Sequence, residues 1–287
     1  MANSKRNPGG RRTNVFQFGA LTVSVLVTAL VLGLLGAGVA LPVVGAMGVV
    51  VRSVPETFNE IPSALEVSEP TQGSQMLDAN GNVMALFFRE RREPVESDQI
   101  APIMKEAIIA IEDWRFESHH GVDPDGMARA LINNLTGGGQ QGASTITQQY
   151  VKNILVDQGV REGDQDMIDA AQEVSAERKL REARYAVALE NRMTKDEILT
   201  GYLNIATLGA NIYGVQAASR AYFSKSATEL TIPEAALLAG IVQSPSTYDP
   251  LQNPEAATER RDVVLGEMKR RGYITQAEYR DAVAIPI

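Results

Sequence analysis

The 39 residues from Thr13 to Val51 contain no charged side chain and are mostly Leu, Val, Ala and Gly. About 20 such residues are enough for a helix to cross a bilayer, so this run predicts a transmembrane anchor. The alternative is a cleaved signal peptide, but its apolar region is usually only about 7–15 residues long. Pro42 and the glycines from residue 33 onward place the helix itself at about Phe18 to Val39.

Charges beside this run predict its orientation. Four basic residues and no acid precede Arg52, and basic residues next to a span favour the cytoplasmic side. We therefore predict a single-pass protein of the cell membrane, with a cytoplasmic N-terminus and an extracytoplasmic catalytic domain. The predicted segments are a basic tail at 1–14, the anchor at 15–42, a juxtamembrane connector at 43–75 and the main domain at 76–287.

The rest of the chain is acidic and globular in composition. From Arg52 onward there are 23 basic and 35 acidic residues, which argues against binding to nucleic acid. An apolar content of 44% is sufficient for a packed core, and the absence of cysteine excludes disulfides, thiolate metal sites and a cysteine nucleophile.

Hydrophobic spacing predicts a mainly α-helical domain with one small β-hairpin. Asn80-Gly81 lies between two apolar segments, which is the typical signal of a tight hairpin turn. From Ile100 onward the apolar residues recur at helical intervals. The expected buried faces are Ile103, Ala107, Ile108 and Ile111, and later Ala183, Val187, Ala188, Ile198, Tyr202 and Leu203.

The first chemical pattern is an acidic pair, Glu112-Asp113, at the end of a helix that begins near Pro102. Glu112 follows Ile108 by one turn, so its carboxylate is expected beside an apolar stripe. Partial desolvation raises the pKa of a carboxyl group toward values suited to proton transfer. On spacing alone, a helix that simply ends in solvated acids is the more ordinary interpretation.

The second pattern is a glycine-rich loop, Gly137–Gly139 and Gly142, that leads to Ser144 and Thr145. Thr145 and Gln148 fit a capping box, so a helix is expected to begin here with its free N–H groups directed at the loop, a position that suits an anion. Gln148 and Lys152 would then share a helix face. A plain loop before a capped helix is the alternative.

The third pattern is Arg178-Lys179-Leu180-Arg181-Glu182, in which Arg178 and Glu182 are one helical turn apart. By itself it would be an exposed helix with a stabilising ion pair. The acidic stretch before it, between Leu155 and Ala176, is expected to be a surface insertion without a catalytic role.

Together these patterns resemble the signature motifs of the peptidoglycan glycosyltransferases, glycosyltransferase family 51, found in class A penicillin-binding proteins. Trp114 is a departure, because many members carry a basic residue there. The resemblance extends over about residues 75–286. The similar segments are Glu112-Asp113-x-x-Phe116-x-x-His119-x-Gly121, Ser144-Thr-Ile-Thr-Gln-Gln149 with Lys152-Asn153, Arg178-Lys179-x-x-Glu182, Glu197 to Gly214 with Asn204, and Glu234 to Pro250.

The resemblance implies a lysozyme-like, mostly helical fold and polymerisation of lipid II into glycan strands, with inversion and release of polyprenyl pyrophosphate. Glu112 would be the general base and Glu182 the second important carboxylate. Glu182 would either ligate a divalent metal, Mg²⁺ or Mn²⁺, or orient the cations. Implied partners are lipid II, the growing glycan chain, the membrane and proteins of cell division or elongation. The implied substrate-binding residues are Asp113, Phe116, His119, Ser144, Thr145, Gln148, Gln149, Lys152, Arg178, Lys179 and Asn204.

Two other functions remain open at this point: a lysozyme-like hydrolase that cleaves glycans, and a non-catalytic scaffold of the cell-wall machinery. The cationic residues argue against the hydrolase, and the presence of both Glu112 and Glu182 argues against the scaffold. The Ser-x-x-Lys and Lys-Thr-Gly motifs of a transpeptidase do not occur in these residues. We expect the chain to be the N-terminal part of a bifunctional penicillin-binding protein, with a complete monofunctional enzyme as the alternative.

Overall fold

In the computed structural model of this chain, the described residues are 65, 67, 74–81, 83–87, 91–135, 142 and 144–287. All of them belong to one compact unit, Ile61–Ile287. The predicted cytoplasmic tail, the predicted anchor, most of the connector and the glycines at 137–139 lie outside the described residues. Within the described ranges, no helix is both long enough and apolar enough to cross a bilayer.

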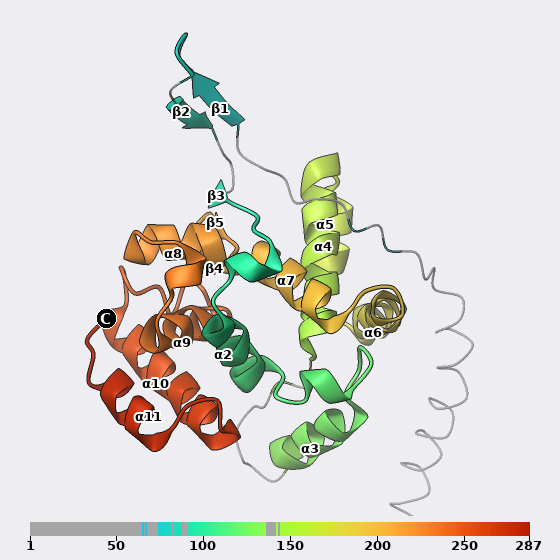
Figure 1. The fold of residues 1–287 in the computed structure, drawn as a ribbon. Coiled ribbons are helices and arrows are strands. Elements are labelled where there is room, and N and C mark those ends of the chain that lie inside the picture. Colours follow the sequence, from blue (N-terminus) through green and yellow to red (C-terminus); the bar gives the residue numbers. More distant parts are fainter. Residues whose placement is uncertain are drawn as a thin grey trace, which may run out of the picture. The chain divides into compact units, whose positions relative to one another are not determined.

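The described residues are mainly α-helical, as the hydrophobic spacing predicted (Figure 1). The helices are α2 Pro102–Glu112, α3 Pro124–Leu135, α4 Ile146–Glu162, α5 Gln165–Gln172, α6 Ala176–Glu190, α7 Lys195–Ile205, α8 Val215–Phe223, α9 Ile232–Ile241, α10 Pro254–Arg271 and α11 Gln276–Val283. Short 3-10 helices are η1 Ser97–Gln99, η2 Phe116–Ser118 and η3 Ala227–Glu229. The strands are β1 Ser74–Leu77, β2 Val83–Phe87, β3 Arg91–Arg92, β4 Thr207–Gly209 and β5 Ile212–Tyr213.

The strands form two small sheets. β1 and β2 pair antiparallel, and Gly81 in their turn has a φ of 84°, which glycine adopts without steric cost. The expected hairpin is therefore confirmed. A second sheet has the order β3-β5-β4, with β3 parallel and β4 antiparallel to β5. Its strands are only two or three residues long, too short to give an alternating pattern in the sequence.

Helix α9 is the centre of the hydrophobic core. Eight of its ten residues are buried, and it packs against α2, α10 and α11. A helix that is apolar on all sides is expected to be surrounded by other elements in this way. α2 also packs against α10, and Ala107 and Ile108 of α2 are fully buried. The C-terminal end of α2, where Glu112 lies, is thus supported by the core.

A second group of helices surrounds α4, which packs against α5, α6 and α7. The predicted buried face of α7 is confirmed, because Ile198, Tyr202 and Leu203 are at most 1% exposed. The predicted face of α6 is wrong. Its buried residues are Arg178, Glu182, Ala186 and Leu189, whereas Ala183, Val187 and Ala188 are only partly buried.

The acidic stretch between Leu155 and Ala176 is not simply a surface insertion. It forms the end of α4 and all of α5, and Asp157 within it is buried. The Asp157 carboxylate accepts a hydrogen bond of 2.7 Å from the buried guanidinium of Arg92, which connects α4 to β3. A buried carboxylate requires such a partner, and the partner is 65 residues away in the sequence.

Candidate active site

One cleft with a volume of about 820 Å³ brings together most of the residues predicted to form a site. The predicted residues that line it come from the end of α2, the start of α4 and the first turns of α6. They are Glu112, Asp113, Ser144, Thr145, Gln148, Gln149, Lys152, Arg178, Lys179 and Glu182. The first and third sequence patterns are more than 60 residues apart in the chain, and all three patterns meet at one surface.

The Glu112 carboxylate lies in a chain of hydrogen bonds that starts in the core. The hydroxyl of Tyr202, which is fully buried, donates to Gln149 Oε1 at 2.8 Å, and Gln149 Nε2 donates to Glu112 Oε2 at 2.8 Å. Burial raises the pKa of Glu112 above its usual value and Asp113 adds to the rise, while the hydrogen bond from Gln149 and the positive charge of Arg260 act in the opposite direction. Glu112 is thus fixed in orientation and prepared to accept a proton.

Asp113 is a structural anchor at the edge of the cleft. Its Oδ2 accepts a hydrogen bond of 3.0 Å from the backbone N–H of Ile146 and lies 2.9 Å from His119 Nε2. The side chain of Asp113 therefore supplies the negative charge at the start of α4. The expectation that this helix N-terminus would offer its free N–H groups to an external anion is corrected for Ile146 and Gln148, whose N–H groups donate to Asp113 and to Thr145 Oγ1.

The capping box predicted from Thr145 and Gln148 is confirmed. Thr145 Oγ1 accepts from the backbone N–H of Gln148, and Gln148 Oε1 accepts from the backbone N–H of Thr145. Thr145 Oγ1 also donates to the carbonyl oxygen of Gly121 at 2.7 Å, so this cap holds the loop after α2 against α4. The two side chains line the cleft, but their hydrogen-bonding groups serve the fold.

Three cations and one carboxylate form a second part of the cleft. Glu182 is 1% exposed and pairs with both neighbours in its motif: Arg178 Nη1 binds Oε1, and Lys179 Nζ lies 2.9 Å from Oε2. Lys179 also donates to Ser144 Oγ at 2.7 Å. Lys152 lies near this group, and burial, followed by the charge of Arg178, lowers its pKa. With three cations against one carboxylate, this group suits an anionic ligand.

The residues around Glu182 do not fit a metal site. Both of its carboxylate oxygens already accept from cations, and a hard divalent ion requires several free oxygen ligands. Within the described part of the chain, no cluster of three or more His, Cys, Asp or Glu side chains could hold a metal ion. Of the two roles predicted for Glu182, the contacts fit the positioning of Arg178 and Lys179 and do not fit metal ligation.

Three predicted substrate-binding residues do not line the cleft. Phe116 is fully buried in the core, with Lys195 Nζ 4.3 Å from the centre of its ring. His119 is 5% exposed and fixes its loop through Asp113. Asn204 bonds both backbone groups of Val95, at 3.0 Å and 2.8 Å. We therefore revise the roles of Phe116, His119 and Asn204 from substrate binding to support of the site.

The cleft also contains residues that the sequence patterns did not reveal. Arg260 of α10 lines it and lies close enough to lower the pKa of Glu112. Tyr202 orients Gln149, and Trp114 lines the cleft beside arginines from α3 and α10. Arginines are common on the polar face of any surface helix, so no local signal could have assigned Arg260 to a site.

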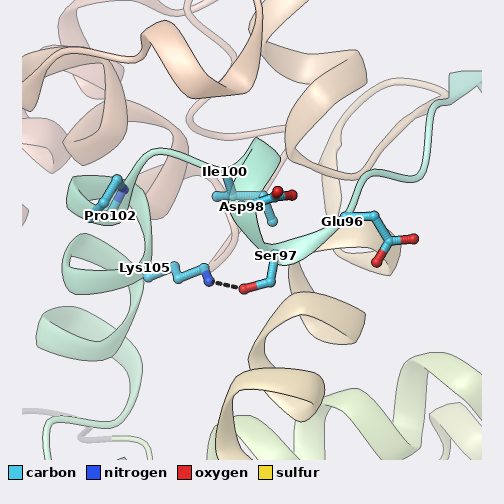
Figure 2. A pocket seen from close by; sticks show the side chains of 6 residues that line it. All are labelled: Glu96, Ser97, Asp98, Ile100, Pro102 and Lys105. Atoms are coloured by element: carbon cyan, nitrogen blue, oxygen red, sulfur yellow. Dashed lines mark hydrogen bonds between the residues drawn. The ribbon is translucent and has the colours of Figure 1, made fainter.

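A separate hollow of about 680 Å³ lies where η1 meets α2, and its lining includes none of the motif residues. Figure 2 shows Lys105 reaching toward Ser97, to whose Oγ its Nζ donates a hydrogen bond. Lys105 Nζ also lies 2.7 Å from Asp196 Oδ1 at the start of α7. These contacts connect η1, α2 and α7, so the role of Lys105 is to hold these elements together.

Comparison with known proteins gives matches to one family. The family model described as transglycosylase matches residues 80–269. Penicillin-binding protein 1A of Streptococcus oralis is 42% identical over 218 residues, which is 76% of this chain and 32% of that protein. Penicillin-binding protein 1A/1B of Bacillus subtilis is 36% identical over 289 residues, which is 100% of this chain and 29% of that protein.

A crystal structure of penicillin-binding protein 1A from Haemophilus influenzae is 25% identical, with a TM-score of 0.42, and covers 77% of this chain and 22% of that chain. The chain thus spans about a third or less of the length of the relatives it matches.

Proposed function

The chain belongs to the transglycosylase family, and on that premise we propose that its cleft polymerises lipid II into the glycan strands of peptidoglycan. The observation that carries the proposal is the presence, in one cleft, of a carboxylate with a raised pKa and a separate group of cations. The first suits removal of a proton and the second suits a leaving pyrophosphate. A glycosyl transfer from a lipid pyrophosphate needs both.

Glu112 is the proposed general base. Its carboxylate takes the proton from the 4-hydroxyl of the acceptor sugar, and the oxygen forms a new bond to the anomeric carbon of the growing chain as the bond from that carbon to the pyrophosphate breaks. Attack from the face opposite the leaving group inverts the configuration. The hydrogen bond from Gln149 Nε2 keeps one carboxylate oxygen in place, which leaves the other for the incoming hydroxyl.

Lys152, Arg178 and Lys179 are the proposed pyrophosphate-binding residues. Negative charge increases on the pyrophosphate as the bond breaks, and fixed cations stabilise that charge where it develops. Glu182 holds Arg178 and Lys179 in a defined geometry before substrate arrives, so these two side chains need little reorganisation. The lowered pKa of Lys152 keeps it a better proton donor than an ordinary lysine.

The competing functions are less well supported by the geometry. A glycan hydrolase uses two carboxyl groups, one of them protonated, on either side of the bond that it cleaves. Both carboxylate oxygens of Glu182 are held by cations, Arg178 and Lys179, so Glu182 does not face the cleft as a free second carboxyl group. A non-catalytic scaffold would not need a half-buried carboxylate with a raised pKa, because that arrangement costs stability.

Several predictions from the resemblance remain predictions. They are the lysozyme-like character of the fold, the membrane anchor at 15–42 with its orientation, the stimulation by Mg²⁺ or Mn²⁺, and binding to division or elongation proteins. The proposed reaction gives the anchor a purpose, because both substrates carry polyprenyl tails and a shared membrane raises their effective concentration.

The test is to incubate the detergent-solubilised chain with labelled lipid II and, separately, with preformed glycan strands, and to separate the products on a polymer gel. We expect long strands from lipid II and no change in the preformed strands. Shortened preformed strands would instead indicate the hydrolase. Binding of lipid II without any product would indicate the scaffold.

A further inference from the structure

A second group of cations lines the same cleft and has no role in the scheme above. Arg129, Arg270 and Arg271 line the cleft together with Trp114, and Arg115 lies beside the Trp114 ring. These four arginines and Trp114 are named the Trp114 cluster. The guanidinium carbons of Arg271, Arg129 and Arg115 lie 3.9, 5.5 and 6.0 Å from the centre of the Trp114 ring. Trp114 itself is 42% exposed, so its ring is accessible to a ligand in the cleft.

Three arginines of this cluster, from separate elements, lie around the Trp114 ring, and Arg270 is the neighbour of Arg271 in the sequence. Arg129 is on α3, Arg270 and Arg271 end α10, and Arg115 follows Trp114 directly. Like charges brought together in this way repel one another: after burial, the charges of Arg270 and Arg129 help to lower the pKa of Arg271. An anion bound among them would relieve that repulsion.

Arg129 is the member best able to bind such an anion. Arg115 pairs with Asp125 at 2.8 Å and lies 3.4 Å from Asp123, and Arg270 and Arg271 share Glu267. Among the described residues, by contrast, no carboxylate pairs with Arg129, which lies against the Trp114 ring. Arg129 is exposed and lines the cleft.

The balance of charge distinguishes this cluster from the pyrophosphate-binding group. Carboxylates pair with three of the cluster's four arginines: Asp123 and Asp125 with Arg115, and Glu267 with Arg270 and Arg271. Lys152, Arg178 and Lys179 face only Glu182, which leaves two net positive charges. A pyrophosphate would be repelled by the three acids, whereas a single planar carboxylate matches one guanidinium and can lie against an indole face.

We propose that the Trp114 cluster binds a carboxylate of the peptide carried by the disaccharide substrate, with Arg129 as its main ligand. This inference rests on the proposed function and adds a determinant of substrate specificity. The cluster would select precursors whose peptide keeps a free carboxylate.

The test compares lipid II with a free peptide carboxylate and lipid II in which the peptide carboxylates are converted to amides, using wild type, Arg129→Gln and Arg280→Gln. Arg280 is a matched control, because its side chain is 74% exposed on α11 and does not line the cleft. We expect wild type and Arg280→Gln to prefer the carboxylate form by roughly 3- to 5-fold in kcat/KM, as for one exposed charge pair, mainly through KM. Arg129→Gln should lose this preference.

Other outcomes would overturn the proposal. A preference that persists in Arg129→Gln, or its absence in wild type, would exclude a carboxylate ligand of Arg129. An equal loss of kcat/KM on both substrates would indicate an anion that both share, the lipid phosphate. If wild type polymerises neither substrate, the proposed function fails, and calorimetry with the soluble peptide then decides the carboxylate site separately: binding that Arg129→Gln abolishes supports it, and no binding to wild type excludes it.

Discussion

Glu112 illustrates how a single residue can favour chemistry at the expense of stability. Its carboxylate is half-buried beside Asp113, and only Gln149 and Arg260 favour the charged form. A neutral side chain of the same shape loses less hydration free energy on folding than a charged one. The desolvation that costs stability therefore also raises the pKa of Glu112, which makes it a suitable base.

The first prediction is that Glu112→Gln unfolds at a higher temperature than wild type at pH 7. The pKa of Glu112 in the folded state is above its ordinary value of 4.5, so the stability that this group contributes is complete below that pH and is lost as the pH rises through the raised pKa. Thermal unfolding across pH 4 to 8 should show the advantage of the variant shrinking toward acid. A variant that is less stable at pH 7 would contradict the raised pKa.

The second prediction concerns Gln149, whose hydrogen bond lowers the pKa of Glu112. In Gln149→Leu this bond is lost, so the pKa rises further and the acid limb of kcat/KM moves to higher pH. Tyr202→Phe is the control, because it removes the bond to Gln149 Oε1 but keeps the amide of Gln149 next to Glu112. An acid limb that stays in place, or moves to lower pH in Gln149→Leu, would exclude this contact as a determinant of the base.

At the scale of elements, α6 determines the chemistry of the cleft because a polar face of the helix is turned inward. Arg178 and Glu182 are buried together, which is possible because each neutralises the other. Hydrophobic spacing assumes that charged residues face water, and for that reason it assigned the wrong face to α6. The same reasoning explains Asp157, whose buried partner Arg92 could not be identified from neighbouring residues.

The loop between α2 and α3 depends on close contact with α6. Gly121 has a φ of 85°, and a Cβ atom there would lie 2.6 to 2.7 Å from backbone atoms of Ala186 and Val187. Its carbonyl oxygen accepts a hydrogen bond from the hydroxyl of Thr145, the residue that caps α4. This one glycine therefore joins the loop to α4 and α6.

The third prediction is that Gly121→Ala destabilises the fold and reduces polymerisation. Gly272→Ala is a matched control, because Gly272 has a φ of 81° with no atom within 4 Å of an added Cβ. Both variants carry the strain of a positive φ, but only Gly121→Ala adds a backbone clash, so its unfolding free energy should fall by a further 1–3 kcal/mol or so. Equal losses in the two variants, measured by denaturant unfolding, would exclude the clash.

For the whole molecule, the sequence predicted features that depend on neighbouring residues better than features that depend on long-range contacts. The hairpin at Gly81 and the cap at Thr145 each depend on residues within about one turn, and each is confirmed. The desolvated position of Glu112 is suggested by the family resemblance, because spacing alone favours a solvated helix end. Arg260 and the two arginines that end α10 reach the cleft only because α10 packs against α2 and α9. Such contacts depend on the tertiary fold, which hydrophobic periodicity does not specify.

The most direct test of the proposed function is to compare polymer formation from labelled lipid II by wild type and Glu112→Gln at the same pH, after both are shown to be folded. Loss of a general base costs about 10²- to 10⁴-fold in rate. We predict long glycan strands from wild type and a loss of at least ~100-fold in Glu112→Gln. Strands formed at the wild-type rate by Glu112→Gln would contradict the assignment of the base and of the cleft as the site of reaction.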